Sequence, residues 1–269
     1  MTILKSLLSK VASNCFMQKM LEINVLASQY MMGIGSGGGV QDSGEQSVFR
    51  VLKQFQPPYC IFDVGSNKGQ FLQLIIDHIG DHNFTTHCFE PSLETFKRLT
   101  EFSKGDRRIR LNNMAVAKEK GQGVLYSDRA ESEIASLTKR KLDHFSIDFN
   151  KTETVEINTI DSYCSDNLIS HINLLKMDIE GHELDALVGA KRMLAERAID
   201  IVMFEFGGCN IDTRTFFKDF WYFFKERDFS IFRITPSGYL HPIKSYKEIH
   251  EQFRATNFLA MLKGCQNCC

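Results

Sequence analysis

The chain has 269 residues, 43% of them hydrophobic and 24% charged, and its formal net charge is −1. This composition is typical of a globular protein with a sizeable core, and it provides no broad basic surface of the kind that binds nucleic acid. No apolar stretch is long enough to span a membrane or clean enough for a signal peptide. The eight cysteines form no short-spaced Cys/His set, so we expect no metal site and a reducing cytoplasm.

Residues 1–55 are predicted to form an N-terminal helical extension with a glycine-rich lid. Residues 3–26 have the pattern of an amphipathic helix, which would pack on the domain or on a second copy of the chain. Lying on a membrane surface is the less favoured alternative. Residues 33–39 are rich in glycine but lack the Lys-Ser/Thr ending of a phosphate-binding loop, so we interpret them as a hinge or lid.

Short apolar runs and helical stretches alternate from residue 59 onward. Strands are predicted at residues 59–64, 84–90, 107–117, 155–160, 172–178, 199–206, 229–235 and 256–262, and helices at 68–79, 92–102, 181–196 and 213–227. This alternation predicts an α/β fold with a Rossmann-like, doubly wound, mostly parallel seven-stranded sheet and an antiparallel edge strand. The domain should span residues 56–264, and residues 265–269 should form a disordered tail that contains cysteines.

Two further segments are interpreted by composition. Residues 118–150 are polar and rich in turn residues, which is typical of a loop or lid over an acceptor. The aromatic run at residues 216–224 has helical spacing and is predicted to pack in the core.

Glycines and carboxylates stand where the predicted strands end, which is where doubly wound sheets bind their ligands. The first strand runs into a turn in which Gly65 and Gly69 allow the backbone to approach a ligand. Glu90 ends the next predicted strand and could accept hydrogen bonds from ribose hydroxyls. Either a dinucleotide or S-adenosylmethionine would fit this pattern. Asp63 in the turn favours the cationic methionine end of S-adenosylmethionine over a pyrophosphate.

Taken together, these segments resemble the FkbM-type methyltransferases, a branch of the class I S-adenosylmethionine-dependent enzymes. The resemblance covers about residues 43–262, and its matching segments are 62–69, 89–91, 113–117, 157–161, 175–183, 187–189, 204–206 and 257–259. Ser66 is a departure, because the family commonly has alanine there. The resemblance implies O-methylation, often of sugar or polyketide hydroxyls. It also implies S-adenosylmethionine-binding residues, which are Asp63, Gly65, Ser66, Asn67, Gly69, Glu90, Pro91, Met114, Ala115 and Asp178.

Methyl transfer to oxygen requires an aligned hydroxyl and a group that takes its proton. The catalytic candidates lie at or just after the ends of the two later strands, and they are Asp178, Glu180, His182 and Glu205. Alternatives stay open for each: His182 could be a solvated helix residue, and Glu180 with Glu183 could favour the helix N-terminus electrostatically. Asp178 with Glu205 could instead hold a divalent metal, which is a minority hypothesis.

Three functions therefore remain. The main hypothesis is an S-adenosylmethionine-dependent O-methyltransferase that acts on a sugar, a glycan or a related small molecule. The alternatives are a dinucleotide-dependent oxidoreductase and a cofactor-binding scaffold without turnover. We expect no nucleic-acid partner and no transmembrane segment, and a homodimer through the N-terminal extension is one expected assembly.

Overall fold

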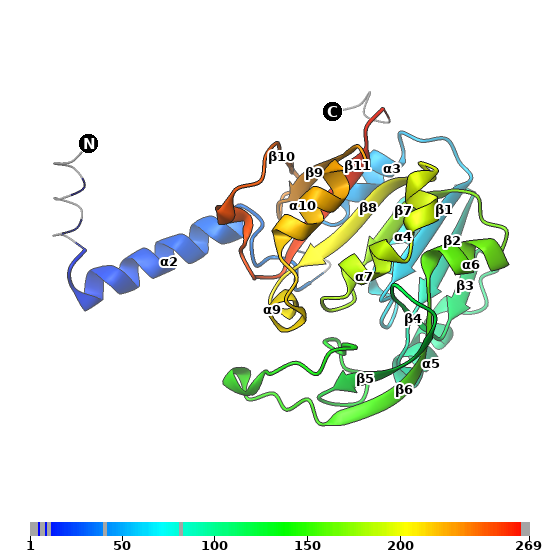
Figure 1. Ribbon diagram of the computed structural model, residues 1–269, viewed down its shortest axis with the longest axis horizontal. Coiled ribbons are helices and arrows are strands. Elements are labelled where there is room, and N and C mark those ends of the chain that lie inside the picture. Colours follow the sequence, from blue (N-terminus) through cyan, green and yellow to red (C-terminus); the bar gives the residue numbers. More distant parts are fainter. Residues whose placement is uncertain (1–4, 6–8, 10–11, 40–41, 81–82, 265–269) are drawn as a thin grey trace.

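The computed structural model describes residues 5, 9, 12–39, 42–80 and 83–264. These residues form a sheet with helices on both of its faces, and helix α2 (Cys15–Met31) extends away from this body (Figure 1). The predicted tail at residues 265–269 lies outside the described residues. Among the described helices, none combines the length and the apolar character that crossing a membrane requires.

The main sheet contains eight strands in the described residues, in the order β10-β9-β11-β8-β7-β1-β2-β3. Their bounds are β1 Tyr59–Val64, β2 Phe84–Phe89, β3 Ile109–Asn112, β7 Ile172–Met177, β8 Ile199–Phe206, β9 Phe229–Ile234, β10 Leu240–Ile243 and β11 Thr256–Leu262. Strands β3, β2, β1, β7 and β8 are parallel. Strand β11 lies between β8 and β9 and is antiparallel to both. Strand β10 is in turn antiparallel to β9. The predicted α/β class is confirmed, with β10 as an additional strand at the edge.

The strand order reverses between β1 and β7, because the chain builds outward through β2 and β3 before it returns to β7. Loops that leave neighbouring strands on either side of such a point diverge and open a crevice at the carboxyl edge of the sheet. The cavity described below lies at this edge.

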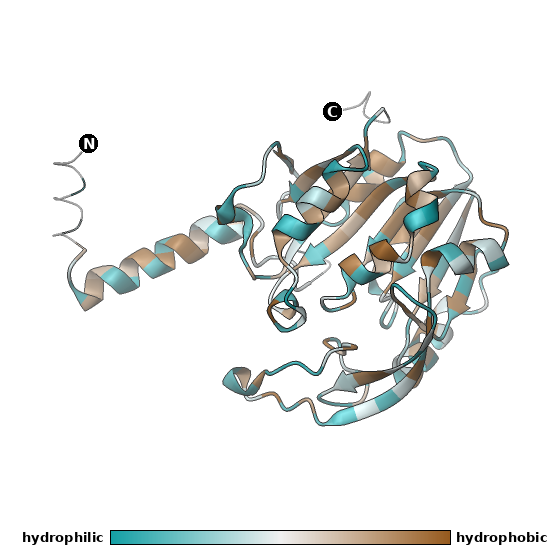
Figure 2. Ribbon diagram, in the orientation of Figure 1, coloured by the Kyte–Doolittle hydropathy of each residue, from teal (hydrophilic) through white to brown (hydrophobic). Residues whose placement is uncertain are grey.

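The helices cover the sheet in two layers. Their bounds are α3 Ser47–Leu52, α4 Gln70–Ile79, α5 Leu93–Ser103, α6 Ile160–Asp166, α7 Glu183–Val188, α8 Lys191–Ala195, α9 Cys209–Thr213 and α10 Phe217–Lys225. Because successive strand residues face opposite sides, Ile61 belongs to the buried cluster that contains α3 and α4, while Phe62 belongs to the cluster that contains α6, α7 and α10. Strand β7 is buried along its whole length, as the apolar run predicted, and the central strands are correspondingly brown in Figure 2.

The aromatic helix α10 packs in the core, which confirms the prediction for this run. Phe217, Phe220 and Phe224 are buried, and the ring of Phe220 stacks on that of Phe204 with 4.8 Å between the centroids. These aromatic side chains thus hold α10 on the sheet.

A second, three-stranded sheet lies beside the main one, in the order β4-β6-β5. It consists of β4 (Ala115–Val116), β5 (Gly121–Ser127) and β6 (Lys151–Asn158). The prediction of a single strand at residues 107–117 is therefore wrong. This stretch contains two strands, β3 and β4, which belong to different sheets. The polar segment 118–150 also contains β5, whose partly exposed residues gave no apolar alternation.

The N-terminal residues divide into two parts. Helix α2 has no buried residue. Residues 33–39 and 42–52, in contrast, contact the domain: the amides of Gly35 and Gly37 donate to the carbonyl oxygen of Ala255, at 3.0 and 2.9 Å. Helix α3 then contributes Phe49 to the core. The domain boundary at residues 55 and 56 stays a prediction, and the glycine-rich segment is docked on the domain in this structure.

Candidate functional site

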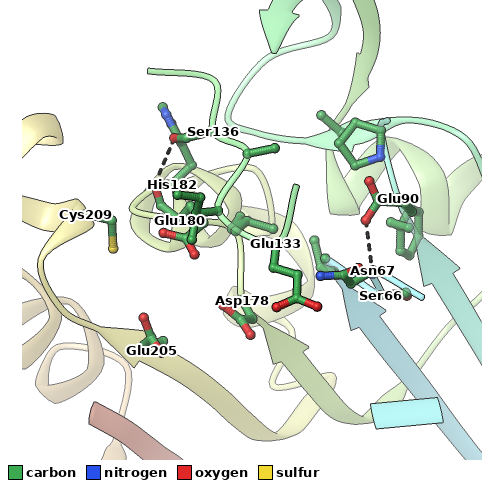
Figure 3. A pocket seen from close by; sticks show the side chains of 18 of the residues that line it. Ser66, Asn67, Glu90, Glu133, Ser136, Asp178, Glu180, His182, Glu205 and Cys209 are labelled. Carbon is green, nitrogen blue, oxygen red and sulfur yellow. Dashed lines mark hydrogen bonds between the residues drawn. The ribbon is translucent and has the colours of Figure 1, made fainter. Parts of the chain in front are cut away.

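A cavity of about 390 Å³ opens at the carboxyl ends of β1, β2, β7 and β8. Figure 3 shows the side chains that face it. Its lining includes most of the predicted site residues, namely Gly65, Ser66, Asn67, Glu90, Pro91, Met114, Ala115, Asp178, Glu180, His182 and Glu205. Asp63 and Gly69 do not line it. The cavity also has charged lining residues outside the predicted site set, which are Glu45, Glu133, Arg140 and Lys176. Of these, Glu133 and Arg140 lie in the segment 118–150 that we interpreted as a loop or lid over an acceptor.

The turn between β1 and α4 forms one wall of the cavity. Gly65 has φ +82°, and a Cβ there would overlap the carbonyl oxygen of Asp178. Gly69 has φ +99° and precedes α4, where a Cβ would lie 2.8 Å from the ring of Phe102. Both positions therefore require glycine. Gly65 brings two loops into contact beside the cavity, whereas Gly69 serves the turn itself.

Glu90 links this turn to the end of β2. One carboxylate oxygen accepts a hydrogen bond from the amide of Asn67 at 3.0 Å, and the other accepts from the amide of Ser92 at 2.9 Å. Burial raises the pKa of Glu90 to about 7. Each carboxylate oxygen can accept more than one hydrogen bond. Glu90 can therefore support the turn and still accept hydrogen bonds from hydroxyl groups of a ligand.

Asp63 lies beneath the turn and is fully buried. The Nζ atom of Lys176, on the neighbouring strand β7, lies 3.2 Å from Oδ1 of Asp63 and 3.8 Å from Oδ2 of Asp178. Burial alone would lower the pKa of Lys176, but the carboxylates of Asp63, Asp178 and Glu45 outweigh burial and raise it. Lys176 therefore stays charged. Its signal in the sequence was a lysine inside an otherwise apolar strand, a rare placement for an unpaired charge.

The turn after β7 is held by a buried carboxylate. Glu183 is fully buried, and its Oε1 accepts hydrogen bonds from the amides of Ile179 at 2.9 Å and Gly181 at 3.3 Å. Burial raises the pKa of Glu183 to about 7. Glu180 adopts φ +53° in this turn, a conformation that costs free energy for a residue with a side chain. Glu183 thus fixes the backbone that presents Asp178 and Glu180 to the cavity.

Glu180 is paired with an arginine from the segment between β5 and β6. Nη1 of Arg140 contacts Oε2 of Glu180, and Nε of Arg140 lies 3.5 Å from Asp212. The hydroxyl of Ser136 donates to the carbonyl oxygen of Glu180 at 2.9 Å. Burial raises the pKa of Glu180 to about 8, with the charge of Asp178 adding to it. The segment around residues 136–140 is therefore attached to the cavity rim.

His182 has a partner at each ring nitrogen. Its Nδ1 lies 3.1 Å from the carboxylate of Asp185, and its Nε2 lies 3.0 Å from the hydroxyl of Thr138. These contacts hold the imidazole in one orientation at the rim. A proton transfer through His182 would have to break one of them.

Glu205 is the penultimate residue of β8 and lies on the side of the cavity away from Glu90, near the thiol of Cys209 (Figure 3). Burial raises the pKa of Glu205 well above its usual range, and the nearby carboxylates of Asp178, Glu180, Glu183 and Glu45 raise it further. Within the described part of the chain, its carboxylate has neither a hydrogen-bond donor nor a cation as partner.

The charges around the cavity are mainly negative. The two cationic lining residues among those described, Lys176 and Arg140, are both paired with carboxylates. A ligand with positive charge would therefore be stabilised here, and a polyanion would not. No group of three or more His, Cys, Asp or Glu side chains with metal-binding geometry occurs among the described residues.

Comparison with known proteins gives a family match. A family model described as the methyltransferase FkbM domain matches residues 63–231, which is more than half of the chain. The 2-O-methyltransferase NoeI of Sinorhizobium fredii (strain NBRC 101917 / NGR234) is 27% identical over 154 residues, covering 52% of this chain and 61% of that protein. The chain thus matches about three fifths of the length of this curated relative.

Two solved structures are also similar. The methyltransferase FkbM from Methylobacillus flagellatus KT has a TM-score of 0.44 and 16% identity, covering 75% of this chain and 43% of that chain. A SAM-dependent O-methyltransferase from Thermotoga maritima has a TM-score of 0.39 and 11% identity, covering 81% of this chain and 64% of that chain. Both are too distant to indicate a substrate.

Proposed function

Because the chain belongs to the FkbM family of S-adenosylmethionine-dependent methyltransferases, we propose that it methylates a hydroxyl of a sugar, a glycan or a related small molecule. The observation that carries this proposal is the row of carboxylates that lines the cavity, Glu205, Glu180 and Asp178. Carboxylates accept hydrogen bonds from hydroxyl groups and can take up their protons. The relative named for 2-O-methyl transfer supports the same chemistry.

The residues of the cavity fit S-adenosylmethionine, which supplies a methyl group on a positively charged sulfur. Gly65 lets the turn after β1 contact the backbone of Asp178 beside the cavity, which a Cβ would prevent. The side-chain oxygen of Asn67 is buried without a hydrogen-bond partner, so it is free to accept from an ammonium group. We assign the methionine part to this turn, the ribose to Glu90 and the adenine to Met114 and Ala115.

The charge of the cavity disfavours the two-phosphate alternative. A dinucleotide needs free amides or cations for its pyrophosphate, and the available lysine and arginine are paired with carboxylates. The sulfonium and ammonium groups of S-adenosylmethionine are instead complementary to acidic surroundings. Asp178, which is 45% exposed beside the turn, would face them.

We also propose that two copies of the chain pair through α2. Apolar residues recur along one side of this helix at alternating spacings of four and three, at Phe16, Met20, Ile23, Ala27 and Tyr30. That spacing is the seam of a coiled coil. Phe16 and Ile23 are 72% and 65% exposed. A cytoplasmic location and the absence of a nucleic-acid partner remain predictions.

The test uses the purified full chain. Calorimetry should show binding of S-adenosylmethionine, and a panel of methyl glycosides and short oligosaccharides should yield S-adenosylhomocysteine together with a methylated sugar seen by mass spectrometry. Glu90→Ala should weaken cofactor binding, whereas Glu226→Gln, on a side chain that is 67% exposed, should not. Binding of NAD(H) alone would overturn the proposal, and cofactor binding without turnover on any sugar would favour the scaffold.

A further inference from the structure

We infer that Glu205 is the general base that takes the proton of the acceptor hydroxyl, an assignment that rests on the proposed function. Four candidates stood after the later strands, and their surroundings differ. Position and lack of partners distinguish Glu205 from the other three, and its access and charge suit the same role.

Position is set by the register of the sheet. Glu90, the turn after β1 and Asp178 follow β2, β1 and β7, Glu205 is the penultimate residue of β8, and these strands are neighbours in the order β2-β1-β7-β8. Met177 pairs with Phe204, so Asp178 and Glu205 each come one residue after paired residues of neighbouring strands, and such strands are spaced about 4.8 Å apart. With the ribose at Glu90 and the methionine part at the turn, the next place along the edge is that of the acceptor. Glu205 is the carboxylate at that place.

The other candidates already have partners. Asp178 lies 3.8 Å from the ammonium of Lys176, and Glu180 is paired with Arg140. His182 has contacts at both ring nitrogens. In the described residues, only the Glu205 carboxylate among the four is left without a donor or a cation. A base must have an oxygen lone pair free for the incoming hydroxyl.

Two glycines keep the Glu205 carboxylate accessible. A Cβ at Gly37 would lie 2.9 Å from Oε2 of Glu205, and a Cβ at Gly207 would lie 3.3 Å from its Oε1. Gly37 belongs to the docked N-terminal segment and lines the cavity itself. The backbone therefore holds the carboxylate from both sides without a side chain that would cover its oxygens.

The chemistry then balances at this carboxylate. The acceptor oxygen bonds to the methyl carbon while the carbon–sulfur bond breaks. The electron pair of the broken carbon–sulfur bond stays on sulfur. The hydroxyl proton passes to Glu205, which returns it to solvent after the product leaves. Burial and the surrounding carboxylates raise the pKa of Glu205, which gives it a higher proton affinity than an exposed glutamate. A base is most effective when its pKa lies near the working pH.

Kinetics of Glu205→Gln provide the first test. With a saccharide acceptor that the wild type methylates, kcat should fall by about 10²–10⁴-fold while the affinity for S-adenosylmethionine changes little. Glu205→Asp should recover part of the rate, and Glu226→Gln should match the wild type. A Glu205→Gln enzyme with near wild-type kcat would overturn the assignment and leave the proposed function standing.

Proton release provides a test that needs no acceptor. The sulfonium charge should displace a proton from Glu205, so binding S-adenosylmethionine should release more protons than binding S-adenosylhomocysteine, measured by calorimetry in two buffers. Other groups face Glu205, namely Glu45, Asp178, Glu180, Glu183 and Cys209. The difference must therefore disappear in Glu205→Gln. If the difference in proton release is unchanged in Glu205→Gln, or absent in the wild type, the methyl group does not lie beside Glu205 and the assignment is overturned. Absence of S-adenosylmethionine binding would instead contradict the proposed function.

Discussion

The ammonium of Lys176 lies 3.2 Å from the carboxylate of Asp63, and their side chains are 7% and 0% exposed. This pair connects β7 to β1 at the point where the strand order reverses. It also supports the turn above it, because Lys176 donates to the carbonyl oxygen of Gly65 at 3.3 Å. An ion pair that is almost fully buried thus lies beneath the cavity, and its lysine is part of the cavity lining.

Removing the cation from this pair should destabilise the fold. Lys176→Met leaves the buried Asp63 carboxylate uncompensated, so we expect the free energy of unfolding to fall by about 3–5 kcal/mol in denaturant titrations. Lys120, whose pair with Asp166 is largely exposed, gives the control, with a loss of about 0–1 kcal/mol for Lys120→Met. The double variant Lys176→Met/Asp63→Asn should recover part of the loss. Equal effects at Lys176 and Lys120 would contradict the buried pair.

Gly65 should be required for cofactor binding because a Cβ would clash there, and not only because its φ is positive. Gly65→Ala places a Cβ against the carbonyl oxygen of Asp178, and we expect the affinity for S-adenosylmethionine to fall at least about tenfold in calorimetry. Gly105 also has a positive φ, of +74°, but nothing lies within 4 Å of its Cβ position. Gly105→Ala should therefore cost about 1–2 kcal/mol of stability with unchanged affinity.

Stability should fall as the pH rises, because Glu183 binds its proton more tightly in the folded state. Its pKa is raised from 4.5 to about 7 by burial, so the unfolding free energy should decrease between these values, by up to about 1.4 kcal/mol per pH unit. Below about pH 4.5 both states are protonated and this dependence disappears. Denaturant titrations across this pH range should show that the unfolding free energy depends less on pH in Glu183→Gln than in the wild type. The same slope in Glu183→Gln and Glu226→Gln would refute this origin.

The docked N-terminal segment should affect the acceptor and not the cofactor. Gly37→Ala puts a methyl group 2.9 Å from the Glu205 carboxylate, so kcat/KM for a saccharide acceptor should fall about tenfold or more. Gly39→Ala meets no atom within 4 Å and should match the wild type. Calorimetry should give equal S-adenosylmethionine affinities for both variants. A loss of cofactor affinity in Gly37→Ala would show that this end of the cavity belongs to the donor.

The exposed stripe of α2 should control the oligomeric state. Ile23→Asp places a charge in the middle of the stripe and should convert a dimer into a monomer in sedimentation experiments. Asn24→Asp changes the charge equally on the neighbouring position, outside the stripe, and should leave the dimer intact. A wild-type chain that sediments as a monomer would contradict the pairing.

The sequence could predict those site residues that stand at the ends of strands. Apolar runs mark the strands, and polar residues such as Glu90 and Asp178 stand out where the runs stop. Parallel strands bring those ends to one edge whatever lies between them in the chain. Glu45 and Arg140 could not be predicted in this way. They reach the cavity from segments whose docking depends on tertiary contacts, such as the bonds from Gly35 and Gly37 to Ala255.

The missed strands have local explanations. Gly121 and Gly123 gave β5 the appearance of a turn, yet it pairs with β6 along its whole length. Pro242 lies inside β10, and a proline inside an apolar run argues against a strand unless the strand is at an edge. Strand β10 occupies that edge position.

The cavity is built from the stretch of chain that matches the family and from segments on both sides of it. Residues 63–231 match the family and supply the turn, Glu90 and Asp178, whereas Gly37, Glu45 and Ala255 close the far end from outside that stretch. Substitutions in segment 33–45 therefore act on the cavity from outside the stretch that matches the family.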